Sequence, residues 1–443
     1  MQKAEHVFPL LDGQPVNYAV RGDAGPIPVR ETMVRKPIHH EFLNFSRASA
    51  IDGGLGLATF SDINLANVEG FAWGQQNVGA DRLRVSAYDA YVRPFINKRK
   101  NLHIKVGAVT TRILLDCNNV AKGVEYVNKG TSQRIFARKE VILAAGAVNS
   151  PKILMHSGIG PREVLESTAP QAIPVRLDVP GVGKNIQDHF FPIIMYGVNK
   201  FPEPVDNGPF APFSPFTNFL DLDGFLSLTG NPADLNFEFV PILAPAILVK
   251  EIDTFNSFVT TGNMPIPPNT AFFIEPAFLI TQPKSRGEIT VFSNNPLDPP
   301  HIVPPYFNDA HNEDVINTRE AFKKSRAIFE KFTQWLQTSP TNLAGENIQI
   351  TGEVIPGPTV ITDEQIESYI KAFSTPSTHQ TGGCKMGLEN DDLAVVDQHF
   401  KVYGISRLRV VDGSVLPTIT RTRPQATIYA MAERAAEFII NDL

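Results

Sequence analysis

The chain has 443 residues, of which 42% are apolar and 19% are charged, a composition typical of a folded protein large enough for two domains. Its net charge of −6, with no Lys/Arg run longer than the one at residues 98–100, excludes the concentrated basic surface that binds nucleic acid. The two cysteines, Cys117 and Cys384, exclude a disulfide framework and a cysteine-ligated metal centre, and no metal site is predicted.

Membrane and export signals are also missing from this sequence. No stretch approaches the roughly 20 consecutive apolar residues of a membrane-spanning helix. Residues 1–13 lack the basic start and the apolar centre of a secretory signal peptide. We therefore expect a soluble protein, and the sequence assigns it neither a compartment nor an oligomeric state.

The first part of the chain shows local signals of secondary structure. Residues 1–30 are dense in Gly, Pro and Asp and are expected to form loops. Apolar residues recur at helical spacing over residues 81–95 and predict a short helix. Alternating apolar residues at 102–115 predict a strand, and the chain from there to residue 136 predicts a β-hairpin.

A strand-to-helix turn follows this hairpin. The apolar residues 141–145 predict a buried strand that ends at Gly146, and Ser150 with Pro151 is expected to open a helix. A turn of this kind usually exists to bring the backbone close to a ligand, often a nucleotide.

From about residue 190 to residue 378 the chain becomes rich in Phe and Pro. Residues 199–219 place phenylalanines among prolines without a regular period, and we interpret this segment as a loop that covers a pocket. The remaining elements are predicted from apolar periodicity. They are strands at 235–244, 271–281 and 287–293, a helix at 313–336, a strand with a turn at 407–417, and a helix at 425–443.

Four sequence blocks occur in the order found in one enzyme family. They are GAVNSPKILMHSGIGP at 146–161, PGVGKNIQDH at 180–189, HQTGGCKMG at 379–387, and LRVVDGSVLP at 408–417 followed by PQATIYAMAERAAEFI at 424–439. On these blocks the chain resembles the glucose-methanol-choline (GMC) oxidoreductases, flavoenzymes that oxidise alcohols. The resemblance covers nearly the whole chain.

The resemblance implies a mixed α/β fold, in which a GMC-type FAD-binding domain carries an inserted substrate-binding domain with an antiparallel sheet. It implies part of the FAD-binding domain at 1–189, the substrate-binding domain at 190–378, and an active-site block that returns to the FAD-binding domain at 379–443. It also implies which residues line the FAD. These are Val109, Ala145, Gly146, Asp412, Gly413, Pro424, Gln425 and Ala426.

One departure from the family concerns the cofactor. Relatives begin with a strand, a GxGxxG turn and a helix that hold the FAD pyrophosphate, and the present sequence contains no such unit. We therefore expect an N-terminally incomplete, truncated flavoenzyme, and whether this chain alone retains FAD is left open. The missing unit on another chain, or a protein that has lost dinucleotide binding, are the alternatives.

A second departure concerns the catalytic residues. Alcohol oxidation needs a base for the hydroxyl proton, and a neutral imidazole suits that role. The resemblance assigns it to His379 and implies a second His or Asn before the PQAT block, where this sequence has Arg423.

Arg423 is always protonated and does not act as a base. Three roles remain open for it: stabilising a developing alkoxide, binding a substrate carboxylate in a bidentate manner, or marking a site without oxidative chemistry. In a fourth interpretation Arg423 points outward and pairs with an acidic neighbour.

Three further residues are interpreted conservatively. In the resembling family the block that ends at His189 is structural, so we expect a packed, hydrogen-bonded histidine there. Cys384 is expected to be buried. Trp335 and the Phe-rich segment suggest an apolar or aromatic substrate pocket.

The function expected from these observations is flavin-dependent oxidation of a small-molecule alcohol at its CH–OH carbon, by hydride transfer to FAD with His379 as the base. Two alternatives remain. One is a hydroxynitrile lyase on the same fold, in which Arg423 supplies a cationic site and FAD takes no part in redox chemistry. The other is a protein without FAD that serves in non-redox catalysis or binding.

Overall fold

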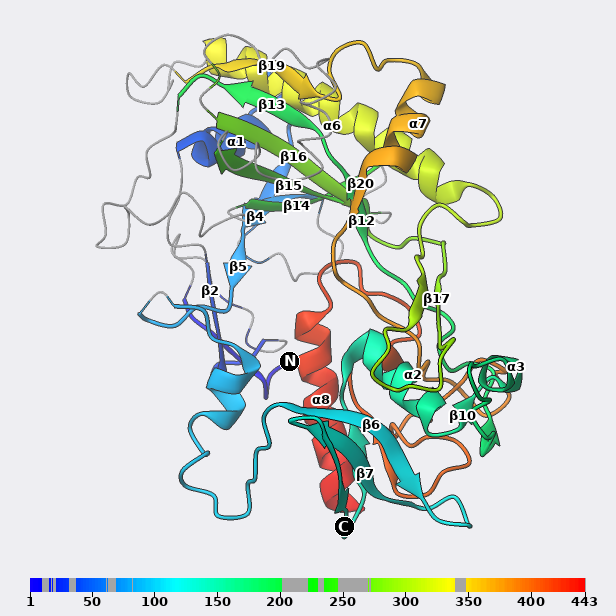
Figure 1. Cartoon of the computed structure of the whole chain (residues 1–443). Coiled ribbons are helices and arrows are strands. Elements are labelled where there is room, and N and C mark those ends of the chain that lie inside the picture. The colour runs from blue at the N-terminus through cyan, green and yellow to red at the C-terminus, as the bar shows by residue number, and fades with distance from the viewer. Residues whose placement is uncertain are drawn as a thin grey trace.

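The computed structural model covers residues 1–443 and has two regions, one above the other in Figure 1. The description below excludes the residues drawn in grey. They are residues 10–15, 17, 19–20, 32–36, 61, 63–68, 82, 201–221, 230–234, 246–269, 271, 339–347 and 443. The Phe-rich segment, with the pocket loop expected there, lies almost entirely outside the described residues.

The upper region is built on a seven-stranded sheet with the strand order β19-β13-β16-β15-β14-β4-β3. All neighbouring strands are antiparallel except β3 and β4, which confirms the expected antiparallel sheet. Its strands are β3 (Ala58–Phe60), β4 (Gly70–Trp73), β13 (Met195–Val198), β14 (Leu222–Ser227), β15 (Leu235–Pro245), β16 (Phe272–Ile280) and β19 (Ile350–Ile355). Helices α1 (Pro37–Arg47) and α6 (Glu313–Thr338) pack on the sheet, and α7 (Asp363–Phe373) packs against α6.

An aromatic core joins these helices to the sheet. The ring of Phe42 in α1 lies 5.1 Å from Phe71 in β4, 5.8 Å from Phe239 in β15 and 5.0 Å from Phe332 in α6, measured between centroids. All four side chains are buried, and burying a phenylalanine stabilises a fold by about 1.5–3 kcal/mol. Helix α1 and strand β4 therefore share a hydrophobic core with strands and helices of the region at 190–378.

The lower region contains a three-stranded antiparallel meander of β6 (Ala108–Leu115), β7 (Ala121–Asn128) and β8 (Thr131–Phe136). This confirms the expected hairpin, although residues 101–107 before it form no strand. A π-helix, Tyr88–Val92, stands where a longer helix at 81–95 is predicted.

The strand-to-helix turn at Gly146 lies in the same region. Strand β9 (Val141–Leu143) pairs in parallel with β21 (Leu408–Val410), so the two strands end at the same edge. β9 is shorter than predicted and only half-buried, because Ile142 faces outward. Helix α2 (Gly146–His156) begins directly after this edge, and Pro151 lies inside it rather than at its start.

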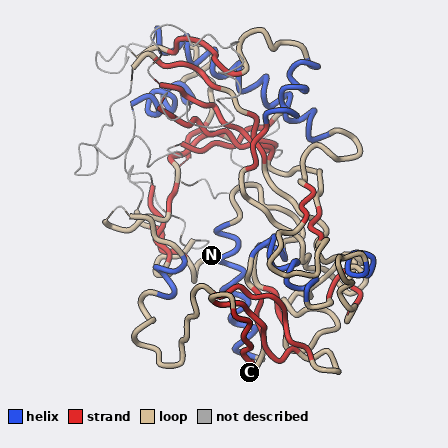
Figure 2. Tube along the Cα trace, in the orientation of Figure 1, coloured by secondary structure: helices blue, strands red, loops and turns tan. Residues whose placement is uncertain are grey.

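The final helix, α8 (Gln425–Asn441), begins at the end that faces the upper sheet, and the C-terminus lies at the bottom of Figure 1. Loops and short strand pairs connect the two regions (Figure 2). The remaining short elements are β1 (Glu5–Val7), β2 (Ile27–Glu31), β5 (Gln75–Gln76), β10 (Ile159–Gly160), α3 (Arg162–Glu166), β11 (Leu177–Asp178), β12 (Phe190–Pro192), β17 (Glu288–Thr290), β18 (His301–Val303), β20 (Ser374–Pro376) and a 3-10 helix, Gly413–Val415.

Strands β1 and β2 correct the expectation that residues 1–30 form only loops, since the two pair in parallel. Among the residues that the structure describes, none of the helices combines the length and the apolar character needed to cross a bilayer. The same residues contain no group of three metal-ligating side chains.

Candidate active site

Two of the sequence blocks meet at Asp188, which is fully buried. One carboxylate oxygen of Asp188 accepts the backbone N–H of His379 at 2.7 Å. The other accepts the amide of Gln380 and the hydroxyl of Tyr306, both at 2.8 Å. Burial raises the pKa of Asp188, and the four hydrogen bonds it accepts act in the opposite direction. The block at 180–189 thus holds the backbone at the predicted catalytic histidine.

The ring of His379 contacts a second histidine from the same block. The Nδ1 atoms of His379 and His189 are 3.0 Å apart, and Nε2 of His189 lies 3.0 Å from the carbonyl oxygen of Thr281. His189 is fully buried, as expected for a packed histidine, while His379 is half-buried.

Both imidazoles are held in their neutral form. Burial, the neighbouring His189 and the charge of Arg423 together lower the pKa of His379 to about 3. Burial also lowers the pKa of His189 to about 4. His379 is therefore unprotonated at neutral pH, as a base must be.

Arg423 points inward and pairs with two acidic residues of the upper sheet. Its guanidinium lies 2.7 Å from Asp223 in β14 and 2.9 Å from Glu238 in β15. Asp223 and Glu238 are buried, and the side chain of Arg423 is 30% exposed. Burial raises the pKa of Glu238, and the two carboxylates raise the pKa of Arg423 although burial acts against this.

The strand register explains why both carboxylates reach Arg423. Glu238 pairs with Phe225, which lies two residues from Asp223, so the two acids share one face of the sheet. Phe237 and Phe239 alternate with Glu238 and point to the aromatic core on the other face. The acidic face is therefore the one that meets the loop before α8. This corrects the interpretation of Arg423 as an outward-pointing residue, although the acidic pairing itself is present.

The residues expected to line FAD gather where β9 and β21 end. Asp412 follows β21, and its Oδ2 accepts the backbone N–H of Gly146 at 2.9 Å and the hydroxyl of Ser150 at 2.5 Å. The hydroxyl oxygen of Ser150 accepts the N–H of Ala145. Gly413 packs against the first turn of α8, because a Cβ there would lie 3.2 Å from Ile428. The structure thus brings together Ala145, Gly146, Asp412, Gly413 and the start of α8, which comprises Pro424, Gln425 and Ala426.

This edge fits part of an FAD site. In α/β proteins a nucleotide binds beyond the carboxyl ends of parallel strands, beside a glycine that lets the backbone approach. Gly146 has φ +84°, and a Cβ at this position would meet no atom within 4 Å. Val109 lies at the start of β6 and is 55% exposed. Gly146 and Val109 would hold the cofactor through main-chain groups. The residues gathered at this edge do not include those that would hold the pyrophosphate.

The base block lies against the same edge. Gly382 donates its N–H to the carbonyl oxygen of Gly413 at 3.2 Å. A Cβ on Gly413 would also lie 3.6 Å from the carbonyl oxygen of Gln380, the residue after His379. The predicted base and the predicted cofactor turn are therefore adjacent.

Replacing Gly146 with alanine tests the cofactor turn. We expect Gly146→Ala to lower the free energy of unfolding by about 1 kcal/mol, because a left-handed residue with a Cβ is strained. We also expect weaker FAD binding, measured by flavin fluorescence titration. Gly130→Ala is the matched control, since Gly130 has φ +78° with equally open space but lies in the β7–β8 turn. Equal FAD affinity for both variants would contradict this placement.

The neutral histidine pair makes stability depend on pH. In the unfolded chain both imidazoles gain a proton near pH 6.5, whereas in the folded protein they resist protonation down to about pH 4 and 3. The unfolded state then binds more protons, so the free energy of unfolding falls as the pH drops from about 6.5 towards 4. We expect the melting temperature to fall less between pH 7 and pH 5 in a His189→Asn/His379→Asn variant. Equal slopes in the two proteins would refute the prediction.

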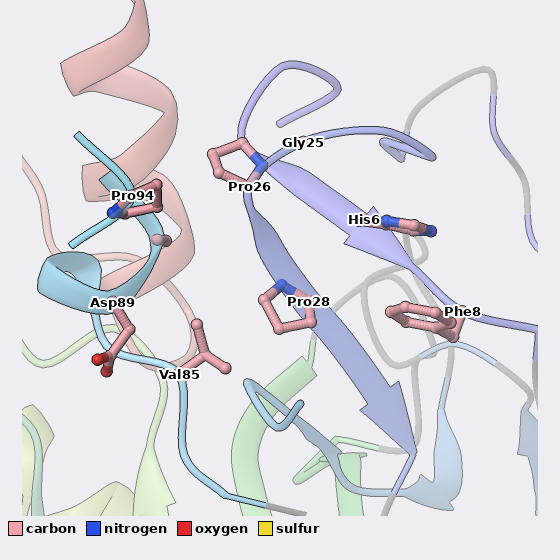
Figure 3. A pocket seen from close by; sticks show the side chains of 9 residues that line it. His6, Phe8, Gly25, Pro26, Pro28, Val85, Asp89 and Pro94 are labelled. Atoms are coloured by element: carbon pink, nitrogen blue, oxygen red, sulfur yellow. The ribbon is translucent and has the colours of Figure 1, made fainter. Parts of the chain in front are cut away.

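A separate pocket of about 440 Å³ lies between β1, β2 and the π-helix (Figure 3). His6, Phe8, Pro28 and Asp89 are among the side chains that line it. None of the residues predicted for catalysis or FAD binding lines this pocket. Asp89 is engaged by the backbone N–H and the hydroxyl of Ser86, so the pocket adds no group to the site described above.

Trp335 packs against helix α1. Its ring lies 6.0 Å from that of Phe45, and its indole N–H donates to Glu41, which places it between α6 and α1. Cys384 is fully buried, as expected.

Sequence analysis missed the two acids that pair with Arg423 and the contact between the two histidines. Asp223 and Glu238 each interrupt an apolar strand, in LDGFLS and NFEFV, which was the available signal. For His189 the signal was its position next to Asp188 in QDH.

Comparison with known proteins identifies the family of the chain. Residues 4–191 match the N-terminal part, and residues 283–432 the C-terminal part, of the GMC oxidoreductase family. The chain belongs to the GMC oxidoreductases.

Its relatives include glucose dehydrogenase (FAD, quinone) of Drosophila pseudoobscura, mitochondrial choline dehydrogenase of Mus musculus and oxygen-dependent choline dehydrogenase of Sinorhizobium medicae. Each is 31% identical to the chain, over 96%, 95% and 95% of its residues. The chain spans 65%, 66% and 71% of the lengths of these relatives, or about two thirds.

Solved structures give the same result. Pyridoxine 4-oxidase from Mesorbium loti superimposes with a TM-score of 0.76 at 25% identity, over 98% of this chain and 75% of that one. An FAD-dependent oxidoreductase from Chaetomium thermophilum gives a TM-score of 0.75 at 25% identity, over 100% of this chain and 79% of that one. These likenesses confirm the predicted mixed α/β fold of the family.

Proposed function

We propose that the protein takes part in FAD-dependent oxidation of a small-molecule alcohol, with His379 as the base. The observation that carries the proposal is the position of His379. Its imidazole is half-buried and unprotonated, and the backbone of the next residue, Gln380, lies beside Gly413, where the cofactor is expected. The relatives named above include dehydrogenases and an oxidase whose names specify an alcohol or FAD.

The chemistry divides between the protein and the cofactor. His379 takes the hydroxyl proton of the alcohol. FAD, when bound, would supply the acceptor for the hydride that leaves the carbon bearing the hydroxyl group. The alcohol loses one proton and one hydride and becomes a carbonyl compound. Because His379 starts in its neutral form, it accepts the proton without prior deprotonation.

The pairing of Arg423 restricts its role. The charge of Arg423 is already balanced by Asp223, with Glu238 beside it. We therefore propose that Arg423 holds the loop before α8 against strands β14 and β15, and that its charge lowers the pKa of His379. The same pairing disfavours a bidentate clamp on a substrate carboxylate.

The two alternative functions are less well supported. A hydroxynitrile lyase would need an available cation for cyanide, and Arg423 is engaged by two carboxylates. If the protein did not bind FAD, the open space beside Gly146 would have no ligand to fill it. The names of the relatives also favour oxidation of an alcohol, with choline, glucose and pyridoxine as examples of substrate class.

A visible absorption spectrum with and without FAD tests the proposal. We expect added FAD to remain with the protein through gel filtration, and an alcohol from a panel containing choline, glucose and benzyl alcohol to bleach the flavin bands anaerobically. A folded protein that binds FAD but is bleached by no alcohol, while a panel of cyanohydrins is cleaved, would replace oxidation by lyase chemistry. A folded protein that ignores FAD would refute both.

A further inference from the structure

We infer that His189 is a positioning residue that keeps the hydrogen of the His379 imidazole on Nδ1, and so makes Nε2 the atom that receives the substrate proton. The inference rests on the proposed function only in naming a substrate as the source of the proton that Nε2 receives. The hydrogen positions themselves follow from the contacts of the free protein.

The carbonyl of Thr281 fixes the position of the hydrogen on His189. This carbonyl oxygen can only accept a hydrogen bond, and it lies 3.0 Å from Nε2 of His189. Nε2 of His189 therefore carries a hydrogen. A neutral imidazole has one N–H, so Nδ1 of His189 presents a lone pair.

The same logic extends to the catalytic histidine. The two Nδ1 atoms are 3.0 Å apart, which is a hydrogen-bond distance and requires one donor and one acceptor. Because Nδ1 of His189 is the acceptor, Nδ1 of His379 is the donor. The single hydrogen of neutral His379 is then fixed on Nδ1, and Nε2 keeps its lone pair.

A doubly protonated histidine would break this assignment, and the surroundings oppose it. The charged and polar groups that act on the pair are Arg423, the backbone carbonyls of Thr281 and Thr420, and Asp188, whose carboxylate is bonded to the backbone of His379. Burial of both rings and the nearby cation favour the neutral forms. No carboxylate is hydrogen-bonded to either ring among the described residues.

The support for His379 is rigid. Asp188 and His189 are consecutive, and they hold the backbone and the ring of His379 respectively. One residue earlier, Gln187 and Thr381 exchange two backbone hydrogen bonds of 2.9 Å each. The imidazole planes meet at 86° with centroids 5.2 Å apart. His189 thus acts on His379 as an orienting group acts on a catalytic base, through the tautomer.

Nitrogen NMR of the free protein tests the inference without cofactor or turnover. The chain is labelled with ¹⁵N-histidine, and long-range ¹H–¹⁵N correlations identify which ring nitrogen of His379 is protonated at pH 7. His379→Gln assigns the signals by their loss. We expect hydrogen on Nδ1 in the wild-type protein. A wild-type spectrum with the hydrogen of His379 on Nε2 would overturn the inference.

Two variants test whether the hydrogen-bond acceptor at Nδ1 of His189, and not the size of its side chain, fixes the tautomer of His379. His189→Asn keeps an oxygen near the position of Nδ1 and can still accept from His379, whereas His189→Gln moves its amide to the position of Nε2 and loses that acceptor. We expect His189→Asn to retain the Nδ1–H form and His189→Gln to give a mixture. Retention of the pure Nδ1–H form in folded His189→Gln would also overturn the inference.

Kinetics then distinguish this inference from the proposed function. With an alcohol that the wild-type protein oxidises, we expect His189→Gln to lower kcat about 10²-fold with KM little changed, and His189→Asn to restore most of it. An unchanged kcat in His189→Gln would show that His189 does not position the base. If the NMR result holds but the wild-type protein oxidises no alcohol, the proposed function fails and the hydrogen assignment stands.

Discussion

Replacing His379 with glutamine lowers the rate of alcohol oxidation by about 10²–10⁴-fold, the usual contribution of a positioned general base. The amide cannot take the hydroxyl proton, but it retains the size and polarity of the ring. Asp188 still receives the backbone N–H at this position, so the fold is retained. The measurement is the rate of flavin reduction after anaerobic mixing with the alcohol, which isolates the chemical step.

A histidine away from the site provides the control for this prediction. His301 lies on strand β18 and is exposed, and we expect His301→Gln to reduce the flavin at the wild-type rate. A His379→Gln protein that reduces flavin within a factor of a few of wild type would remove His379 from the mechanism, since no step then requires its proton transfer.

Replacing Arg423 with methionine lowers the free energy of unfolding by about 3–5 kcal/mol at pH 7, the usual cost of leaving a buried charge without its partner. Asp223 and Glu238 are both buried and would face each other without a cation. Urea denaturation monitored by fluorescence measures the effect. The loss should be smaller at pH 5, because burial raises the pKa of Glu238 and its protonation relieves the repulsion between the two acids.

Two companion proteins make this prediction specific. In the triple variant Asp223→Asn/Glu238→Gln/Arg423→Met the charges are removed together, and we expect most of the lost stability to return. Arg134→Met breaks an ion pair with Glu125 in which the arginine side chain is 58% exposed, and it should cost about 1 kcal/mol or less. Equal losses for Arg423→Met and Arg134→Met would mean that the Arg423 cluster is solvated.

The sequence predicted the parts of the fold that depend on local periodicity or on the four family blocks. Helix α6 and the β6–β8 meander carry clear apolar periods, and the turn at Gly146 carries its glycine. Strands β1 and β2 were missed because they are only three and five residues long. Their extended form depends on pairing with each other and not on the local propensity of their residues.

The candidate site shows the same division. His379 was predicted from its block, and its pairing with His189 was not, because 190 residues separate the two in sequence. The inward direction of Arg423 depends on two acids that lie 185 and 200 residues earlier. The register of β14 and β15 decides that these acids face the site, and a single residue of slip would turn them towards the aromatic core.

The way the chain crosses between the two regions has a consequence for how the protein is made. Val141 of β9 pairs with Leu408 of β21, and Phe71 of β4 pairs with Gly224 of β14. Neither core can therefore close until these distant segments have left the ribosome. Contacts this far apart in sequence slow folding. The buried residues of the upper core extend to Ile370 and those of the lower core to Ala435, so the lower core closes only when nearly the whole chain has been made. A nascent chain stalled before residue 400 would expose the lower core to aggregation or chaperone capture.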